Sequence, residues 1–382
     1  MNVLYLTVPS YFDLDTSFVR EMDKLSNMTV LLVLSPKSKK SSAFSIDKLD
    51  SKCDVIQASN YSGFEKYSAV LNLDKWFIAN NPDNSIFSCI RLFFKIKKFI
   101  KKNKIDLIHT TTMCKTVFFF TPFLFLFPYT LLTVHDPIPH NNLSWYEKLF
   151  RRKIFFKANK KLLFLSKIHL HQFCVEYGFS EENIFFSRLS AYDIFKNYAL
   201  SKNPYGMYIL FFGRIEPYKG VELLIDAFEK SNLSQNGVKL VIAGKGKIKY
   251  GPKSNDNNII ILNRFIPNEE LASLIFHCKY VVLPYISATQ SGCVMSAYAF
   301  NKPILATSVG NLPVDVENDV TGLICEPNNV DDLVKKMDAM NSLDLSRMSQ
   351  NINEMYQEGG ALSWFQIAKD VKSIYESVKH KS

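Results

Sequence analysis

The apolar runs in the first half of the chain alternate with amphipathic stretches. Short runs typical of buried strands cover residues 3–8 and 30–34, one helical stretch begins near Thr16, and another covers residues 87–104. Strands that alternate with helices in this way form a parallel sheet with helices on its faces. The pattern therefore predicts an α/β domain, which we place at residues 1–195.

The same rhythm restarts after a loosely patterned segment at residues 193–204, which is typical of a linker. A strand at 207–212 and a loop at 213–220, followed by a helix, repeat the order of elements at the start of the chain. Two Rossmann-like domains are the economical explanation, with the second domain at residues 205–361. A last helix at 362–382 is long enough to pack back on the first domain.

One uncharged, phenylalanine-rich run at residues 117–134 approaches the length of a membrane span. Pro122 and Pro128 interrupt it, so we interpret it as a short buried helix followed by a strand. The start of the chain lacks the basic residues and the long apolar core of a signal peptide. The seven cysteines are scattered and form no C-x-x-C pair, which indicates neither disulfides nor zinc. We therefore expect a cytoplasmic protein.

The net charge of +10 calls for an acidic partner, for which nucleic acid, a membrane surface and phosphorylated substrates are the candidates. No nucleic-acid module accompanies the charge, so nucleic acid is disfavoured. The helix at 87–104 carries a basic face with Phe94 among its lysines, and a second basic cluster follows at 148–161. Such a helix favours contact with an anionic membrane surface, and the alternative is an ordinary solvated face.

Several histidines follow predicted strands, where open α/β sheets bind their ligands. His135 and Asp136 come directly after the strand that ends the phenylalanine-rich run, and His109 and His140 are weaker candidates of the same kind. An isolated histidine is more often structural, so both interpretations of His135 stay open. The pair His169 and His171 has metal-like spacing only on a strand, and without a third ligand we assign it to structure.

Two loops of the second half have the composition of an anion site. Thr289, Gln290, Ser291 and Gly292 precede an apolar helix, whose free N–H groups and dipole favour a phosphate. In the loop at 213–220, Gly213 allows a sharp turn, and Arg214 and Lys219 reach forward from the end of a strand. Two cations facing the helix start would bracket a diphosphate. The alternatives are an ordinary capped helix and two solvated cations. The loop after the first strand has no glycine, which argues against a dinucleotide-binding dehydrogenase.

These segments together resemble the nucleotide-binding domain of retaining glycosyltransferases of family 4, which have the GT-B fold. The resemblance implies two Rossmann-like domains that face a central cleft. The resemblance covers nearly all of the second half, at residues 212–228, 241–246, 298–313 and 321–323. In the first half it rests only on residues 105–109 and 133–136.

The resemblance implies that Arg214 and Lys219 hold the diphosphate of a nucleotide sugar, to which the helix start at Ser291 and Gly292 adds backbone N–H groups. It implies that His135 and Asp136 lie beside the transferred sugar. It also implies transfer with retention of configuration, by same-face attack. The two cations and the helix start would replace a metal ion, so we expect no metal and no cofactor besides the nucleotide-sugar co-substrate.

The sequence departs from the family pattern at two glutamates. The second glutamate is replaced by Ser296, and the first would lie near Ala288. The acid that usually follows Leu-Pro is replaced by Val314, with Asp315 next to it. A subset of the family carries Ala-Thr-Gln-Ser-Gly in place of the first glutamate, so activity is not excluded. Recognition of the ribose then falls to another group, for which Ser296 and Asp315 are the candidates.

The leading hypothesis is a hexosyltransferase-like enzyme at the inner face of the cell membrane, which extends a lipid-linked saccharide acceptor in cell-surface polysaccharide synthesis. One alternative is a non-catalytic GT-B partner subunit that binds nucleotide sugar or another glycosyltransferase. A second alternative is a peripheral membrane protein that uses its charge alone.

Overall fold

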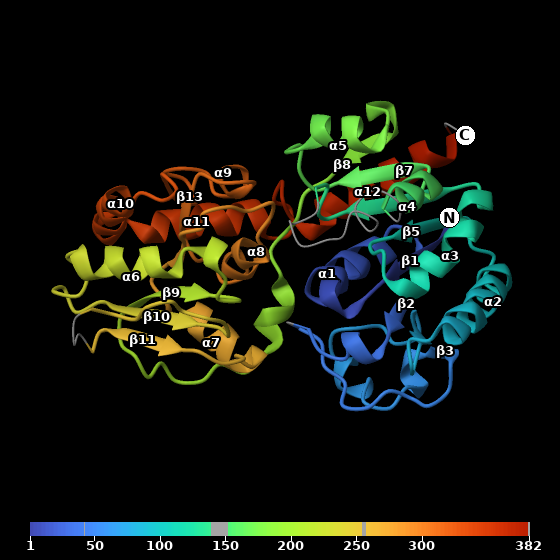
Figure 1. The fold of residues 1–382 in the computed structure, drawn as a ribbon, viewed down its shortest axis with the longest axis horizontal. Coiled ribbons are helices and arrows are strands. Elements are labelled where there is room, and N and C mark those ends of the chain that lie inside the picture. The colour runs from blue at the N-terminus through green and yellow to red at the C-terminus, as the bar shows by residue number, and fades with distance from the viewer. Residues whose placement is uncertain (42, 139–151, 254–256, 381–382) are drawn as a thin grey trace. The chain divides into compact units, whose positions relative to one another are not determined.

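The computed structural model describes residues 1–41, 43–138, 152–253 and 257–380. The chain divides into two compact units (Figure 1). Unit 1 consists of Met1–Leu189 and Trp364–Ser382, and unit 2 consists of Ser190–Ser363. Residues 190–204, which we placed at the end of the first domain and in a linker, fall in unit 2. The physical reason is local packing. The Tyr192 N–H donates to the Met295 carbonyl at 3.0 Å, and a 3-10 turn at Asp193–Asn197 packs on helices α7 (Asn268–His277) and α8 (Gly292–Ala299).

Unit 1 is built on one eight-stranded sheet with the order β3-β4-β2-β1-β5-β6-β7-β8. Every pair in it is parallel except β3 with β4. The strands are β1 (Asn2–Thr7), β2 (Asn27–Leu34), β3 (Asp54–Gln57), β4 (Trp76–Asn80), β5 (Leu107–Thr110), β6 (Thr130–Val134), β7 (Lys161–Phe164) and β8 (Ile184–Phe186). The helices are α1 (Phe12–Asp23), α2 (Ile86–Lys102), α3 (Lys115–Leu126), α4 (Arg152–Ala158), α5 (Leu170–Tyr177) and α12 (Trp364–His380).

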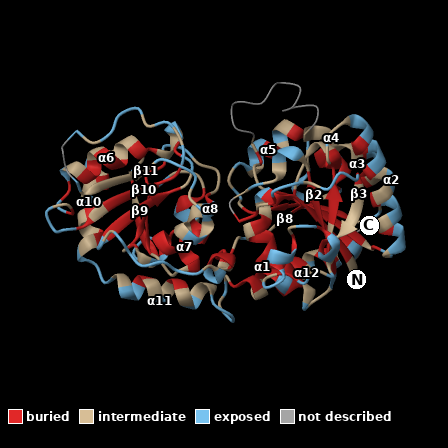
Figure 2. Ribbon diagram, turned by 90° about the horizontal axis from the view of Figure 1, so that it is seen from below, coloured by how far each residue is buried: buried red, intermediate tan, exposed pale blue. Residues whose placement is uncertain are grey.

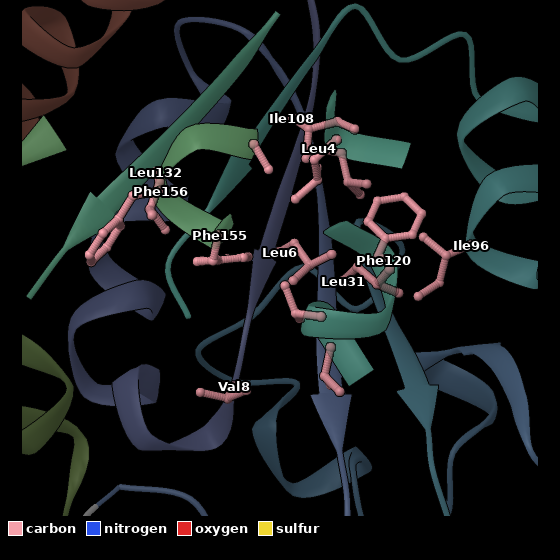
Figure 3. Packing of buried hydrophobic residues seen from close by; sticks show 14 of the residues in the cluster. Leu4, Leu6, Val8, Leu31, Ile96, Ile108, Phe120, Leu132, Phe155 and Phe156 are labelled. Carbon is pink, nitrogen blue, oxygen red and sulfur yellow. The ribbon is translucent and has the colours of Figure 1, made fainter. Parts of the chain in front are cut away.

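Successive side chains of β1 point to opposite faces of the sheet, so they pack against different helices. Leu4 and Leu6 belong to an apolar cluster that also contains Ile96 of α2, Phe120 of α3 and residues of α4 (Figure 3). Tyr5, between them, contacts Phe18 of α1. The helix of α1 begins at Phe12, earlier than the predicted start near Thr16, because a 3-10 turn at Pro9–Tyr11 leads directly into it.

The phenylalanine-rich run forms α3 and β6, as the interpretation of a helix followed by a strand required. Pro122 lies inside α3 and does not end the helix, which continues to Leu126. None of the helices in the described residues is long and apolar enough to cross a membrane. The final helix α12 packs against α1 within unit 1.

A buried polar network fixes α1 and α12 to the sheet. Asp15 of α1 accepts hydrogen bonds from the Tyr5 hydroxyl at 2.7 Å and the Thr7 hydroxyl at 2.5 Å. His109 of β5 bonds through Nδ1 to the Tyr375 hydroxyl of α12 and through Nε2 to the Thr133 hydroxyl, both at 2.7 Å. His109, a weaker ligand candidate, therefore has both ring nitrogens engaged inside the unit.

Burial raises the pKa of Asp15 from 3.8 to about 8, against the hydrogen bonds from Thr7 and Tyr5. Between these two values the folded state holds a proton that the unfolded state has released, so this carboxyl makes stability fall as pH rises. We expect Asp15→Asn to remove a downward slope of up to about 1.4 kcal/mol per pH unit in the free energy of unfolding. Urea denaturation of both proteins at several pH values between 4 and 8 measures this difference.

The control for this prediction is Asp23→Asn on the same helix, at a position that is only half-buried. This variant should keep the downward slope of the unmodified protein. A D15N variant with the same pH dependence as the unmodified protein would mean that Asp15 is ionised when buried.

Unit 2 contains a six-stranded, all-parallel sheet with the order β11-β10-β9-β12-β13-β14. The strands are β9 (Tyr208–Phe212), β10 (Lys239–Ala243), β11 (Ile259–Leu262), β12 (Val281–Leu283), β13 (Ile304–Thr307) and β14 (Gly322–Cys325). The helices are α6 (Val221–Lys230), α7 (Asn268–His277), α8 (Gly292–Ala299), α9 (Leu312–Asp315), α10 (Val330–Ser342) and α11 (Leu345–Tyr356). In both units the central strands are buried and the outer helix faces are exposed (Figure 2).

Candidate nucleotide-binding site

Two loops are joined at the carboxyl ends of β9 and β12, which are neighbours in the sheet of unit 2. Gly220 has a φ of +64°, and a Cβ atom placed on it would lie 2.0 Å from the Pro284 carbonyl oxygen. The Ile286 N–H donates to the Tyr218 carbonyl at 2.8 Å. The loop at 213–220 and the stretch at 284–292, which we predicted to act together, therefore form one rigid edge.

Lys219 is held on this edge by an aromatic ring. Its ammonium lies 3.6 Å from the centre of the Tyr285 ring, and the hydroxyl of that buried tyrosine lies 3.1 Å from the Ser291 hydroxyl. Burial lowers the pKa of Lys219, and the positive charge of Arg214 lowers it further. In the described part of the chain no carboxylate pairs with this ammonium. An anion bound here would therefore relieve the repulsion between two cations.

Arg214 and the start of α8 complete the edge. Arg214 is exposed and forms no ion pair within the described residues. Ser291 is the N-cap residue of α8, and its carbonyl accepts from the Val294 N–H at 3.1 Å. The N–H groups of Gly292 and Cys293, in the first turn, have no partner inside the helix, and the helix dipole makes this end positive. Two cations and a helix start are thus gathered within one unit.

The remaining predicted residues lie around this edge. Gln290 is half-buried in the turn before α8, and Gly213 takes a φ of +121° at the start of its loop. The Ser296 hydroxyl donates to the Gly292 carbonyl at 3.0 Å, inside its own helix. The Asp315 carboxylate accepts from the Asn311 side chain at 2.8 Å. Both candidates for ribose recognition are therefore engaged locally, and their role in binding stays a prediction.

The sequence reasoning missed Tyr285 and Gly244. Tyr285 follows Pro284 at the end of a strand, but only the folded chain brings its ring beneath Lys219. A Cβ atom on Gly244 would lie 1.7 Å from the Gly213 carbonyl oxygen, so the close approach of these two strand ends requires glycine. The run Gly244-Lys-Gly246 was the signal for such a close approach.

In unit 1, His135 stacks on Tyr11, with ring centres 3.8 Å apart and planes at 10°. Its Nε2 atom is buried and has no hydrogen-bond partner among the residues that the structure describes. Burial lowers the pKa of His135 to about 4, although the charge of Asp136 acts in the opposite direction. His135 and Asp136 line a cavity of about 120 Å³, where the Asp136 carbonyl accepts from Arg152. A neutral imidazole with an unused ring nitrogen is suited to hydrogen-bond a ligand hydroxyl.

The other histidine candidates do not add to this cavity. His140 lies outside the described residues. His169 has a φ of +64° and precedes α5, and His171 lies within that helix, so the pair is not on a strand and has no metal-binding spacing. No group of three potential metal ligands occurs among the residues that the structure describes.

The chain is similar to known glycosyltransferases. Residues 195–355 match the family model described as Glycosyl transferases group 1. An uncharacterized glycosyltransferase of Methanocaldococcus jannaschii is 31% identical over 44% of this chain and 48% of its own length. A D-inositol 3-phosphate glycosyltransferase of Mycobacterium sp. (strain KMS) is 28% identical over 37% of this chain and 34% of its own length. These matches span less than half of either curated relative.

The fold itself matches over the whole chain. HepE of Anabaena, solved in complex with UDP and glucose, superimposes with a TM-score of 0.66 at 13% identity, covering 99% of this chain and 100% of HepE. This likeness shows the fold alone, and the assignment to family 4 stays a prediction. The predicted resemblance is otherwise confirmed: residues 195–355 match the glycosyltransferase group 1 model, and the chain has the GT-B fold of two parallel-sheet Rossmann-like domains.

Proposed function

We propose that the chain is a retaining, metal-independent glycosyltransferase that moves a sugar from a nucleotide-diphosphate donor to a lipid-linked saccharide acceptor. The observation that carries the proposal is the edge of unit 2 where Lys219, seated on Tyr285, lies with Arg214 and the start of α8. The complex of HepE with UDP and glucose and the group 1 match support a nucleotide sugar as the ligand.

The proposed chemistry follows from the charges at this edge. The bond between the sugar and the donor diphosphate breaks, and negative charge develops on the leaving phosphate oxygen. Lys219, Arg214 and the N–H groups at the start of α8 stabilise that charge without reorganising. These protein groups would take the part in stabilising the leaving group that a metal ion takes in other enzymes. His135, which is neutral above pH 4, offers its free ring nitrogen to a hydroxyl of the sugar.

A second candidate is a non-catalytic partner subunit. It is favoured by Ala288 and Ser296, which stand where the resemblance expects glutamates, and by the engagement of Asp315 with Asn311. Such a subunit would bind nucleotide sugar or another glycosyltransferase without transferring the sugar.

Transfer from a panel of UDP- and GDP-sugars to saccharide acceptors separates the two candidates, with mass spectrometry to detect the product and NMR spectroscopy to determine its anomeric configuration. We expect one donor to give a product whose anomeric configuration matches that of the donor. Binding of UDP or GDP by calorimetry with no turnover of any acceptor would favour the partner subunit. Absence of both binding and transfer would contradict the enzyme and leave only a subunit that binds another glycosyltransferase.

The proposal places the protein at the inner face of the cell membrane through the exposed face of α2. This face begins with Phe87, Ile90 and Phe94, of which Phe87 is 84% and Phe94 63% exposed. Lys97, Lys98 and Lys101 continue the same face toward the end of the helix, and all three are exposed. Aromatic groups that enter the headgroup region beside lysines are typical of binding to anionic bilayers. Lys95, another lysine of this helix, pairs with Asp54 at 2.6 Å.

We expect the triple variant Lys97→Glu, Lys98→Glu and Lys101→Glu to bind anionic vesicles about 100-fold more weakly or worse, since each lysine near such a surface contributes about 1 kcal/mol. Co-sedimentation with phosphatidylglycerol vesicles measures the effect. A salt concentration of about 0.1 M, where the Debye length is about 10 Å, screens the charges only moderately. A matched control reverses three exposed lysines elsewhere, Lys202, Lys335 and Lys369. Equal losses in both triple variants would show that net charge, rather than the face of α2, binds the membrane.

A further inference from the structure

A cavity of about 670 Å³ opens in unit 1 at the carboxyl ends of β1 and β2 and the start of α3. It is far larger than the cavity beside His135, and the two are neighbours because both are lined by Thr112 and Met113. Carboxyl ends of parallel strands are where open α/β sheets bind ligands. None of the residues named for the donor site contributes to it.

The charged side chains that line this cavity are cationic. Lys37 and Lys115 are its ionisable residues, apart from the thiol of Cys114, and no aspartate or glutamate lies among the described residues that form its wall. Neither lysine forms an ion pair in the described chain, and the Lys115 ammonium donates only to the Asn84 carbonyl, at 2.6 Å. Hydroxyls of Ser35 and Ser38 add further hydrogen-bonding groups. Two lysines without a carboxylate between them match the charge of a phosphate.

One wall of the cavity is apolar. Phe118 and Phe119 of α3 line it, and the same helix ends at Leu126, which is 84% exposed. Because α3 packs beside α2, this apolar wall is on a helix that adjoins the exposed face of α2. The lysines could therefore bind the acidic group of a ligand, while the phenylalanine wall contacts an apolar chain or a sugar ring attached to it.

We propose that this cavity receives the phosphate of the acceptor, so that the acceptor substrate belongs to the class of sugar or polyprenyl phosphates. The inference rests on the proposed function, since an acceptor exists only if the chain transfers sugars. The acceptor then extends past Thr112 and Met113 toward the smaller cavity, which His135 lines. The phosphate group holds the acceptor at one end, and the end that reacts lies toward His135.

Phosphate binding at this cavity is tested apart from transfer, in a protein whose donor site has been disabled by Arg214→Ala and Lys219→Ala. The probes are glucose 1-phosphate in solution and neutral phosphatidylcholine vesicles that contain a polyprenyl phosphate. Vesicles with an equal amount of phosphatidylserine control for charge alone. Calorimetry and vesicle co-sedimentation report binding even if no sugar is ever transferred.

We expect at least one probe to bind, and Lys37→Ala with Lys115→Ala to weaken its binding about tenfold or more, as the loss of charge-assisted hydrogen bonds implies. Lys37 is exposed, so the single variant Lys37→Ala keeps the fold and should weaken binding too. The control is Lys40→Ala, an exposed neighbour outside the cavity, which should bind as before. Binding of glucose 1-phosphate alone assigns a soluble acceptor, and binding of the vesicles alone assigns a lipid-linked one.

The inference is overturned if neither probe binds, or if the lysine variants bind as well as their parent. It is also overturned if the unmodified protein glycosylates an uncharged acceptor as efficiently as its phosphorylated form. A protein that binds a probe through Lys37 and Lys115 but transfers no sugar would contradict the proposed enzyme and leave the phosphate site in place.

Discussion

Lys219→Met is expected to lower the kcat/KM of sugar transfer about 100-fold, because it removes one preorganised positive charge from the leaving diphosphate. Methionine retains an apolar stem that can pack on the Tyr285 ring, so the edge of unit 2 should stay folded. Arg214→Ala should have a smaller effect of the same sign, since Arg214 is exposed where Lys219 is partly buried. Steady-state kinetics with the active donor, and calorimetry with UDP or GDP, measure both variants.

The control for this prediction is Lys230→Met in α6, an exposed lysine that pairs with an exposed Asp331. It should leave transfer and nucleotide binding unchanged. If Lys219→Met bound and turned over the donor like the unmodified protein, the diphosphate would not lie on this edge, and the assignment of the site would be wrong.

Gly220→Ala is expected to destabilise unit 2 by about 3 kcal/mol or more. One contribution is the left-handed backbone conformation, which residues with a Cβ atom disfavour, and the other is a steric clash. The added Cβ would lie 2.0 Å from the Pro284 carbonyl, so the two loops must separate. That separation also breaks the bond from the Ile286 N–H to the Tyr218 carbonyl and moves Lys219 from the Tyr285 ring. Urea denaturation measures the stability, and nucleotide binding should be lost with it.

Gly237→Ala separates the two contributions. Gly237 has a φ of +72°, close to that of Gly220, but an added Cβ meets no atom within 4 Å. It should therefore cost only about 1 kcal/mol, which is the backbone contribution alone. Equal losses in the two alanine variants would show that the contact between Gly220 and Pro284 does not constrain the site.

The hydrophobic pattern was sufficient to predict the parallel sheets, because a strand buried on both faces must be apolar whatever surrounds it. The runs at 207–212 and 30–34 correspond to β9 and β2. The cations Arg214 and Lys219 could also be found in advance, since loops that follow β strands in an α/β sheet lie at one edge. Start positions were less predictable, as α1 shows, because a 3-10 turn has no periodicity of its own.

Side-chain partners were beyond prediction, because they join residues far apart in the chain. Lys95 resembled its neighbours in the sequence, yet it pairs with Asp54, which β3 brings beside α2. Ser296 stood as a candidate for the ribose, but a serine inside a helix can bond the carbonyl four residues earlier, and it does so here.

The sequence by itself thus determines the α/β fold class of this chain. Apolar periodicity and cations that follow strands are local properties, so they can be read without knowing the tertiary structure. They specify two parallel sheets and a pair of cations beside glycines. Which groups surround those cations depends on packing: the ring of Tyr285 beneath Lys219, the approach of Pro284 to Gly220, and the cavity between Lys37 and Lys115. These contacts arise between loops that are distant in sequence and that the sheets bring together at the carboxyl ends of their strands, so they exist only once the chain has folded.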